Sequence, residues 1–234
     1  MKTYNDKKSD LVNKVFSDVY KKYDVMNDIM SFGIHRLWKK NLISWMRPQK
    51  DDKLIDVASG TGDLAKYFSI KTNHQSQIYC VEPNTDMLKV GKKKLETYKN
   101  VKWFNAKAEK LPFDDETFDF YTISFGIRNV SDINKSLKEA LRVLKTGGKF
   151  FCLEFSKIQN DLLNKLYSNY SKIIPSIGKL VVGNSEPYDY LVNSIKKFYD
   201  QEELQEIISK NGFSNIEYRN LLNGTASIHT GWKI

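Results

Sequence analysis

Three acidic residues and a glycine turn carry the clearest chemistry in this sequence. Asp56 lies inside a short apolar segment, the turn Ser59-Gly60-Thr61-Gly62 follows it, and Asp63 comes next. A second apolar segment ends at Glu82, twenty positions after Gly62. Glycine lets the backbone approach a ligand closely and adopt a positive φ, and a carboxylate can accept hydrogen bonds from both hydroxyls of a ribose. These residues predict a site for a ligand that contains a ribose.

Three details of the same segment favour a cationic ligand over a nicotinamide dinucleotide. The third glycine of the dinucleotide fingerprint is missing, because position 65 is Ala. Asp56 would repel a pyrophosphate at the end of its strand, and Asp63 would repel it at the start of the next helix. S-adenosylmethionine carries a sulfonium and an ammonium and no phosphate, so it suits these two acids better. A plain turn with two structural acids is the alternative.

These residues need a sheet that brings strand ends together. Apolar segments alternate with helical patterns, which predicts an α/β fold with a mostly parallel sheet and helices on both faces. Ligands bind such sheets at the carboxyl ends of the strands. The expected strands are residues 53–58, 77–81, 101–106, 118–125 and 149–155, and the expected helices between them are residues 63–68, 84–98 and 132–144.

The C-terminal part of the chain predicts a different arrangement. A helix at residues 201–211 is followed by strands at 214–222 and 225–233. Asn223-Gly224 joins the two strands, and this dipeptide is typical of hairpin turns. The sheet therefore has seven expected strands and ends in an antiparallel pair.

Helices are expected on either side of the core. Apolar residues at steps of three and four predict N-terminal helices at residues 10–31 and 35–47. An insertion rich in Tyr, Leu and Ile predicts a helical cap over the carboxyl edge of the sheet. We interpret residues 1–234 as one domain, with an N-terminal helical region (10–47), a cofactor-binding core (53–155), a cap (156–199) and a C-terminal helix and hairpin (200–234).

The composition limits the class of protein. The apolar runs are far shorter than the roughly 18 residues needed to cross a bilayer, and the charged N-terminus has no apolar signal core. We expect a cytoplasmic protein. The net charge of +9 fits a composition bias, nucleic acid or an anionic membrane surface. Motifs typical of nucleic-acid binding are missing from the sequence, so peripheral association with the inner face of a membrane is the expected use of this charge.

Three longer segments resemble the ubiquinone/menaquinone biosynthesis C-methyltransferases. They are residues 22–38, which begin Lys22-Tyr23-Asp24-Val25, residues 122–130, which contain Ser124-Phe-Gly126-Ile-Arg128-Asn129, and residues 142–156. The similarity extends from about residue 11 to the C-terminus. It implies a Rossmann-like class I methyltransferase fold and S-adenosylmethionine as the cofactor.

The resemblance also assigns cofactor contacts. Positions that match those of the family are Thr61 in the glycine turn, Glu82, the pair Lys107-Ala108, and Ser124; the residues beside them, Asp56, Gly60, Gly62 and Pro83, complete the expected cofactor site. Two of these positions depart from the family. Glu82 stands where Asp is usual, and its longer side chain can still reach a ribose. Lys107 stands where Asn or Asp is usual, and a lysine cannot accept a hydrogen bond from the adenine amino group.

The resemblance implies methylation of a ring carbon of a polyprenylated quinol, either a benzoquinol or a demethylmenaquinol. The protein must align the methyl group with that carbon and exclude water. A neighbouring group must also stabilise the phenolate or accept the phenolic proton. The candidates are Arg128 and Asn129 for the quinol oxygens, Tyr23 over the cofactor, and His35 as a proton acceptor. A purely structural role is the alternative for each of them, and for Glu154.

Other readings stay open on the sequence alone. The acceptor could be another small phenolic or lipid-like molecule, or the chain could be a cofactor-binding scaffold in a quinone-synthesis assembly. A homodimer is a further expected state. A stripe of Leu191, Ile195 and Phe198 in the cap, beside Lys196 and Lys197, predicts a tail groove, a membrane-facing surface or ordinary core. Metal-ligand spacing is missing, and the expected chemistry needs no metal.

Overall fold

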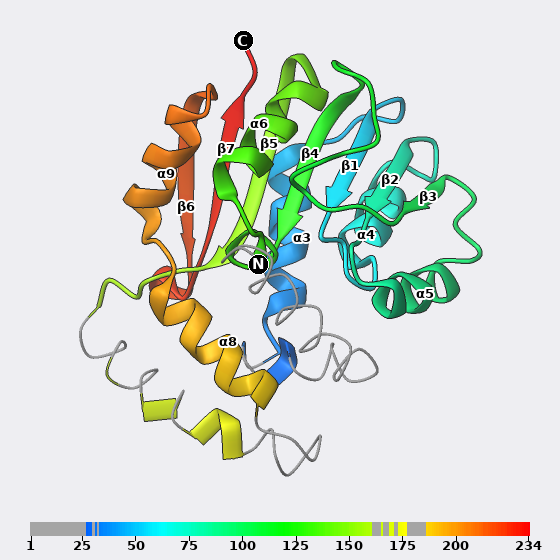
Figure 1. Ribbon diagram of the computed structural model, residues 1–234. Helices are drawn as coiled ribbons and strands as arrows, with labels where there is room; N and C mark the ends of the chain where they lie inside the picture. Colours follow the sequence, from blue (N-terminus) through cyan, green and yellow to red (C-terminus); the bar gives the residue numbers. More distant parts are fainter. Residues whose placement is uncertain are drawn as a thin grey trace, which may run out of the picture.

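A single twisted sheet organises the computed structural model (Figure 1). The structure describes residues 27–29, 31, 33–160, 165, 169–170, 173–176 and 186–234. The strand order is β3-β2-β1-β4-β5-β7-β6. The strands are β1 (Lys53–Val57), β2 (Gln77–Val81), β3 (Val101–Phe104), β4 (Phe118–Ser124), β5 (Leu144–Phe155), β6 (Ser214–Leu221) and β7 (Ala226–Trp232).

The pairing of the strands confirms the predicted fold class. The pairs β1–β2, β1–β4, β2–β3 and β4–β5 are parallel, whereas β5–β7 and β6–β7 are antiparallel. Strand order reverses at β1, which has β2 on one side and β4 on the other. The carboxyl ends of β1 and β4 therefore meet at the switch point, where an open α/β sheet binds its ligands.

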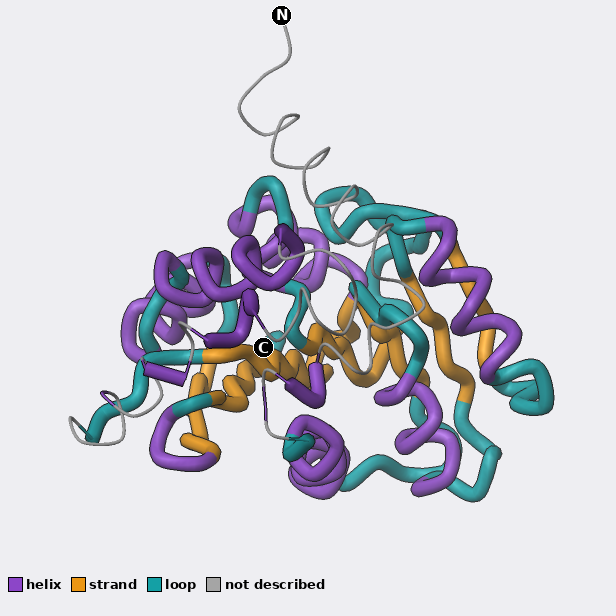
Figure 2. Tube along the Cα trace, turned by 90° about the horizontal axis from the view of Figure 1, so that it is seen from below, coloured by secondary structure: helices purple, strands orange, loops and turns teal. Residues whose placement is uncertain are grey.

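Helices cover both faces of this sheet, as Figure 2 shows. Helices α3, α4 and α8 contribute to a core cluster on one face, and α6 and α9 contribute to a cluster on the other. The described helices are α3 (His35–Met46), α4 (Asp63–Lys71), α5 (Thr85–Lys94), α6 (Ile133–Val143), α8 (Glu186–Lys197) and α9 (Gln201–Lys210), with short 3₁₀ turns η2 (Ile127–Asn129) and η3 (Leu222–Gly224).

Side-chain caps set the starts of three of these helices. Asn84 accepts hydrogen bonds from the first turn of α5, and Asp132 does the same for α6. Asp200 and Glu203 form a capping box at the start of α9. Each such cap stabilises a helix by about 1 kcal/mol, so the polar residue before each apolar pattern decides where the helix begins.

Two of the boundaries that differ from those expected depend on strand pairing. Strand β5 begins at Leu144, ahead of the expected residue 149, because Leu144 pairs with Phe118 before a register shift in the β4–β5 ladder. The C-terminal strands pair Leu221 with Ala226, so four residues form the connection. Asn223 still adopts the left-handed conformation that suits a turn, with φ 52°.

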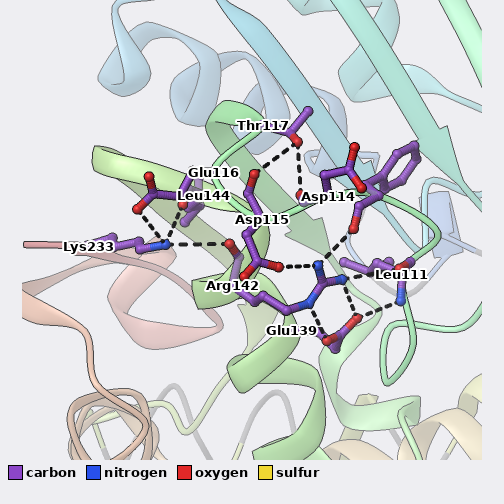
Figure 3. A network of polar contacts seen from close by, with 10 residues as sticks. Leu111, Asp114, Asp115, Glu116, Thr117, Glu139, Arg142, Leu144 and Lys233 are labelled. Carbon is purple, nitrogen blue, oxygen red and sulfur yellow. Dashed lines mark hydrogen bonds and ion pairs between the residues drawn. The ribbon is translucent and has the colours of Figure 1, made fainter.

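A polar network holds the loop before β4 onto the end of α6 (Figure 3). The Arg142 guanidinium donates to the carbonyls of Leu111 and Phe113 and pairs with Asp115 and Glu139. This network lies beside the first residues of β4 and β5, at the amino ends of these parallel strands. It is therefore at the opposite edge of the sheet from the glycine turn, and Arg142 has a structural role.

Helix α8 lies below the carboxyl ends of β4 and β5 in Figure 1. Leu191 is buried in the core cluster of one sheet face, Ile195 packs against that cluster, and Phe198 packs against the other. Of the three roles predicted for this stripe, the structure therefore favours core packing. Between residues 161 and 185, the structure describes the cap at seven positions.

Most of the predicted helix at residues 10–31 lies outside the described residues, and so does Tyr23. Residues 27–29 and 31 are helical, in agreement with the pattern. Among the helices that the structure describes, none is both long enough and apolar enough to cross a membrane.

Candidate cofactor and substrate site

The turn between β1 and α4 folds tightly because three of its residues are left-handed. The φ angles are 51° at Ala58, 58° at Gly60 and 83° at Gly62. The Ser59 amide donates to the carbonyl of Val81 at 3.2 Å, which ties the turn to the end of β2. Glycine adopts positive φ at little cost, so Gly60 and Gly62 explain how the backbone can bend here over the edge of the sheet.

Glu82 braces this turn from the end of β2. One carboxylate oxygen accepts from the Gly60 amide and the other from the Asn84 amide, both at 2.9 Å. Burial raises the pKa of Glu82 to about 7, although both hydrogen bonds favour the charged form. Glu82 therefore links the glycine turn to the start of α5, and its contact with a ribose stays a prediction.

A pocket opens beside the turn and brings three predicted cofactor residues together. These are Asp56 on β1, Thr61 in the turn and Ser124 at the end of β4. Thr122 donates to Asp56 Oδ1 at 2.7 Å, whereas Asp56 Oδ2 and Ser124 Oγ are buried without a partner among the described residues. The complete lining is Lys39, Asp56, Ala58, Ser59, Thr61, Asp63, Leu64 and Ser124.

The two acids of the sequence argument differ electrostatically. Burial raises the pKa of Asp56 to about 7. Burial opposes the ionisation of Asp63 as well, but the ammonium groups of Lys39 and Lys94, each 2.8 Å from its carboxylate, hold its pKa well below the usual range. The charge of Asp63 is thus already compensated by lysines, and Asp56 alone retains an unpartnered oxygen for a cation.

The loop after β3 carries the expected adenine contacts. Ala108 is buried, and Lys107 is exposed and pairs with Lys110 in an isolated β-bridge. Asn105, which the sequence argument missed, donates to the carbonyls of Glu82 and Pro83 at 2.8 and 2.9 Å. These bonds hold the loop against the end of β2, and the adenine contacts stay predictions.

Arg128 and Asn129 form the 3₁₀ turn η2 directly after β4. Arg128 is buried and ion-paired with Glu154 at the end of β5, and its Nη1 also donates to the carbonyl of Phe125 at 2.9 Å. Its Nε is buried without a partner in the described part of the chain. The guanidinium also lies over the ring of Phe155, 5.6 Å from the centroid. The partner Glu154 fixes the guanidinium and leaves one donor available.

Tyr190 of α8, another residue that the sequence argument missed, connects the cap to η2. Its hydroxyl donates to Asn129 Oδ1 at 3.0 Å. The Asn129 amide group in turn donates to the Phe125 carbonyl at 3.4 Å. The only sequence signal for this contact is the aromatic character of the cap, and the contact ties the position of η2 to that of α8.

His35 is buried at the start of α3. Its Nε2 lies 3.0 Å from Asp28 Oδ1, and Asp28 also pairs with Arg36. Burial lowers the pKa of His35 despite this carboxylate. His35 is outside the pocket lining, so a role as proton acceptor stays a prediction. No group of His, Cys, Asp or Glu side chains suited to hold a metal ion occurs within the described ranges.

Comparisons with known proteins agree with this geometry. A sequence model described as the ubiE/COQ5 methyltransferase family matches residues 1–233. The ubiquinone/menaquinone biosynthesis C-methyltransferase UbiE of Rickettsia bellii (strain OSU 85-389) is 50% identical over 98% of this chain and 95% of its own length. The protein of the same name from Brucella abortus (strain S19) is 45% identical over 98% of this chain and 87% of its own length.

Solved structures share the fold at low sequence identity. A SAM-dependent methyltransferase from Thermotoga maritima has a TM-score of 0.67 and 20% identity, and the match covers 95% of this chain and all of the other. Phosphoethanolamine N-methyltransferase 2 of Haemonchus contortus, solved with S-adenosyl-L-methionine, has a TM-score of 0.64 and 16% identity, over 84% of this chain and 52% of its own.

Proposed function

Because the chain belongs to the ubiE/COQ5 methyltransferase family, we propose that it transfers a methyl group from S-adenosylmethionine to a ring carbon of a polyprenylated quinol. The product would be an intermediate of ubiquinone or menaquinone biosynthesis. One observation carries this proposal beyond the comparisons. The cofactor turn after β1 and the Arg128 turn after β4 touch, since a Cβ on Gly126 would lie 2.5 Å from the Cβ of Ala58.

The residues around the pocket fit this cofactor. The unpartnered Asp56 Oδ2 can accept from the ammonium of its amino-acid end. Gly62 is needed by the turn itself, because its φ is 83° and a Cβ there would lie 2.8 Å from Leu95 Cδ1. The adenosine would lie toward Glu82 and Ala108. S-adenosylmethionine supplies an electrophilic methyl group on a sulfonium.

The substrate side of the site would lie at η2. A quinol carbon becomes a better nucleophile when the neighbouring oxygen gains phenolate character, and a fixed cation stabilises that charge most in a site that excludes water. Arg128 is such a cation, because Glu154 and the Phe125 carbonyl hold its guanidinium while Nε stays unpartnered among the described residues. Arginine does not lose its proton at neutral pH, so its role is to stabilise the phenolate.

Asn129 would assist from the neighbouring position. Its side chain is already oriented by Tyr190 and the Phe125 carbonyl. A side chain held in this way needs no further ordering when the substrate binds. The same contact joins α8 to the site.

The experiment uses methyl-labelled S-adenosylmethionine with two reduced quinols, a methoxy-benzoquinol and a naphthoquinol, each carrying a short prenyl tail. We expect label on a ring carbon, and the preferred ring identifies the pathway. Arg128→Ala should lower turnover about 100-fold or more and leave cofactor affinity intact. No transfer to either ring, despite cofactor binding, would contradict the proposal in favour of another acceptor or a scaffold.

A second variant separates chemistry from folding. Arg128→Ala leaves the buried Glu154 carboxylate without its partner, which destabilises a protein by about 3–5 kcal/mol. The double variant R128M/E154Q removes both charges together and avoids that cost. If the double variant folds, binds the cofactor and still methylates at the wild-type rate, Arg128 has no role in the reaction.

A further inference from the structure

The pocket beside the glycine turn contains one residue from outside the cofactor core. Lys39 belongs to α3, ahead of β1, and its side chain lines the pocket together with Asp56 and Ser124. Lys39 is only 6% exposed, and its Nζ lies 2.8 Å from Asp63 Oδ2. An ammonium buried to this degree is costly unless its donors find partners, so its position needs an explanation.

The need to neutralise Asp63 does not explain why the Lys39 ammonium is buried beside the pocket. The other oxygen of Asp63 accepts from Lys94 Nζ at 2.8 Å, and Lys94 also donates to Thr61 Oγ1 at 3.1 Å. One carboxylate therefore faces two ammonium groups, of which only Lys39 is part of the pocket lining. A lysine ammonium has three donors, and the described contacts of Lys39 Nζ use one of them.

The pocket also contains the complementary charge. Asp56 Oδ2 and Ser124 Oγ are both buried, and neither has a hydrogen-bond partner in the described ranges. Lys39 is close enough to Asp56 to favour the charged form of that carboxyl group. The pocket thus contains the Lys39 ammonium, with donors that the described contacts do not use, and the Asp56 carboxylate, with one unused acceptor oxygen. An α-amino acid group, with one ammonium and one carboxylate on the same carbon, matches this pair.

We propose that Lys39 binds the carboxylate of the cofactor's amino-acid end, while Asp56 binds its ammonium. This inference rests on the cofactor of the proposed function and extends it to a residue of the N-terminal helical region. Helix α3 is then part of the cofactor site, and its packing against α4 controls how firmly the cofactor is held.

The test measures calorimetric binding of two ligands to the full-length protein. S-adenosylhomocysteine has the amino-acid end, and 5′-methylthioadenosine lacks it but keeps the adenosine and the sulfur. Lys39→Met should weaken binding of S-adenosylhomocysteine roughly tenfold or more, the usual effect of losing a hydrogen bond between charged groups. Its affinity for methylthioadenosine should stay within about twofold of wild type.

Lys94→Met is the matched control. It removes the other lysine of Asp63 without removing a pocket-lining residue, so it should not discriminate between the two ligands. Lys39→Arg keeps a cation and should recover part of the lost affinity, which guards against a simple folding defect in Lys39→Met. Retained binding of methylthioadenosine reports that the variant is folded.

Two results would overturn the assignment of Lys39. One is that Lys39→Met lowers the affinity for both ligands equally. The other is that Lys94→Met also weakens binding of S-adenosylhomocysteine and leaves binding of methylthioadenosine unchanged. Failure of the wild-type protein to bind S-adenosylhomocysteine at all would instead count against the proposed function itself. The readout is affinity alone, so the outcome does not depend on which quinol is the substrate.

Discussion

At the scale of single residues, the site combines groups whose charge depends on their surroundings. Asp56 and Glu82 are both buried, and burial raises the pKa of each to about 7. Asp63 is nearly as close to the cofactor turn, yet its lysine partners keep it ionised. The difference is one of pairing. Asp56 has one oxygen without a partner among the described residues, so a cationic group of the ligand can bind there. Asp63 is already paired with two lysines.

This difference predicts a pH dependence of cofactor affinity. The ionised form of Asp56 attracts the ammonium of S-adenosylmethionine, and its population grows as the pH rises through the folded-state pKa of about 7. Affinity should rise roughly tenfold between about pH 5.5 and 6.5, where an α-amino group keeps its proton. Calorimetric titration across this range measures it, and Asp56→Asn should flatten the profile.

A neutral ligand supplies the control. Binding of 5′-methylthioadenosine, which has no ammonium, reports any contribution of Glu82 at the ribose side. If wild type and Asp56→Asn show the same pH profile with S-adenosylmethionine, Asp56 does not bind the ammonium.

At the scale of elements, the close approach of two turns positions the chemistry. Strands β1 and β4 are neighbours in parallel register, so the turns that follow them lie side by side. Gly126 permits the contact, because a Cβ there would lie 2.5 Å from Ala58 Cβ and 3.2 Å from Ile123 Cγ1. In the proposed site, backbone packing at this glycine would set the distance between the cofactor and the quinol ring.

Gly126→Ala should force these two turns apart. The φ of Gly126 is −113°, which alanine adopts readily, so the expected cost of about 1–3 kcal/mol comes from overpacking alone. Urea unfolding measures the loss, and cofactor affinity should fall with it. Ala58→Gly in the same chain removes the opposing methyl group at a residue with φ 51°, where glycine is favoured, and should restore stability. A Gly126→Ala protein as stable as wild type would contradict the argument.

At the scale of the whole molecule, the similarity to the relatives extends over nearly all of the chain, so the motifs read from the sequence belong to one shared architecture. The predicted family, the S-adenosylmethionine-dependent methyltransferase activity and the fold class are confirmed. Association with a membrane surface stays a proposal, supported by the net charge of +9 and by the need to reach a lipid-tailed substrate.

Vesicle sedimentation tests that proposal. The protein should sediment with vesicles of phosphatidylglycerol and phosphatidylcholine at low salt and dissociate near ~0.5 M salt, where screening is strong. Lys196 and Lys197 are exposed at the end of α8, the helix whose Tyr190 contacts Asn129. The variant K196E/K197E should bind vesicles more weakly than K135E/K138E, which makes the same charge change on α6 over the other sheet face. Equal binding by both variants would argue against an orientation with α8 toward the membrane.

Much of the architecture was predictable because it depends on local pattern. Strand β2 has the bounds expected from its apolar run, and α6 and α9 begin at capping residues that the sequence displays. The glycine turn was recognised because its spacing after an apolar strand has a physical meaning. The extended start of β5 and the length of the final hairpin connection were not predictable, since cross-strand register decides both.

The sequence by itself determined the order of strands and helices along the chain, the family, and the glycine turn that is predicted to bind the cofactor. Each of these depends on residues that are close together in the chain. Only the tertiary structure decided which charges remain for a ligand. Lys39 meets Asp63, Arg128 meets Glu154 and Tyr190 meets Asn129 through contacts between residues 24 to 61 positions apart. Composition and spacing cannot tell a paired charge from an unpaired one, because pairing depends on which helix packs against which strand end.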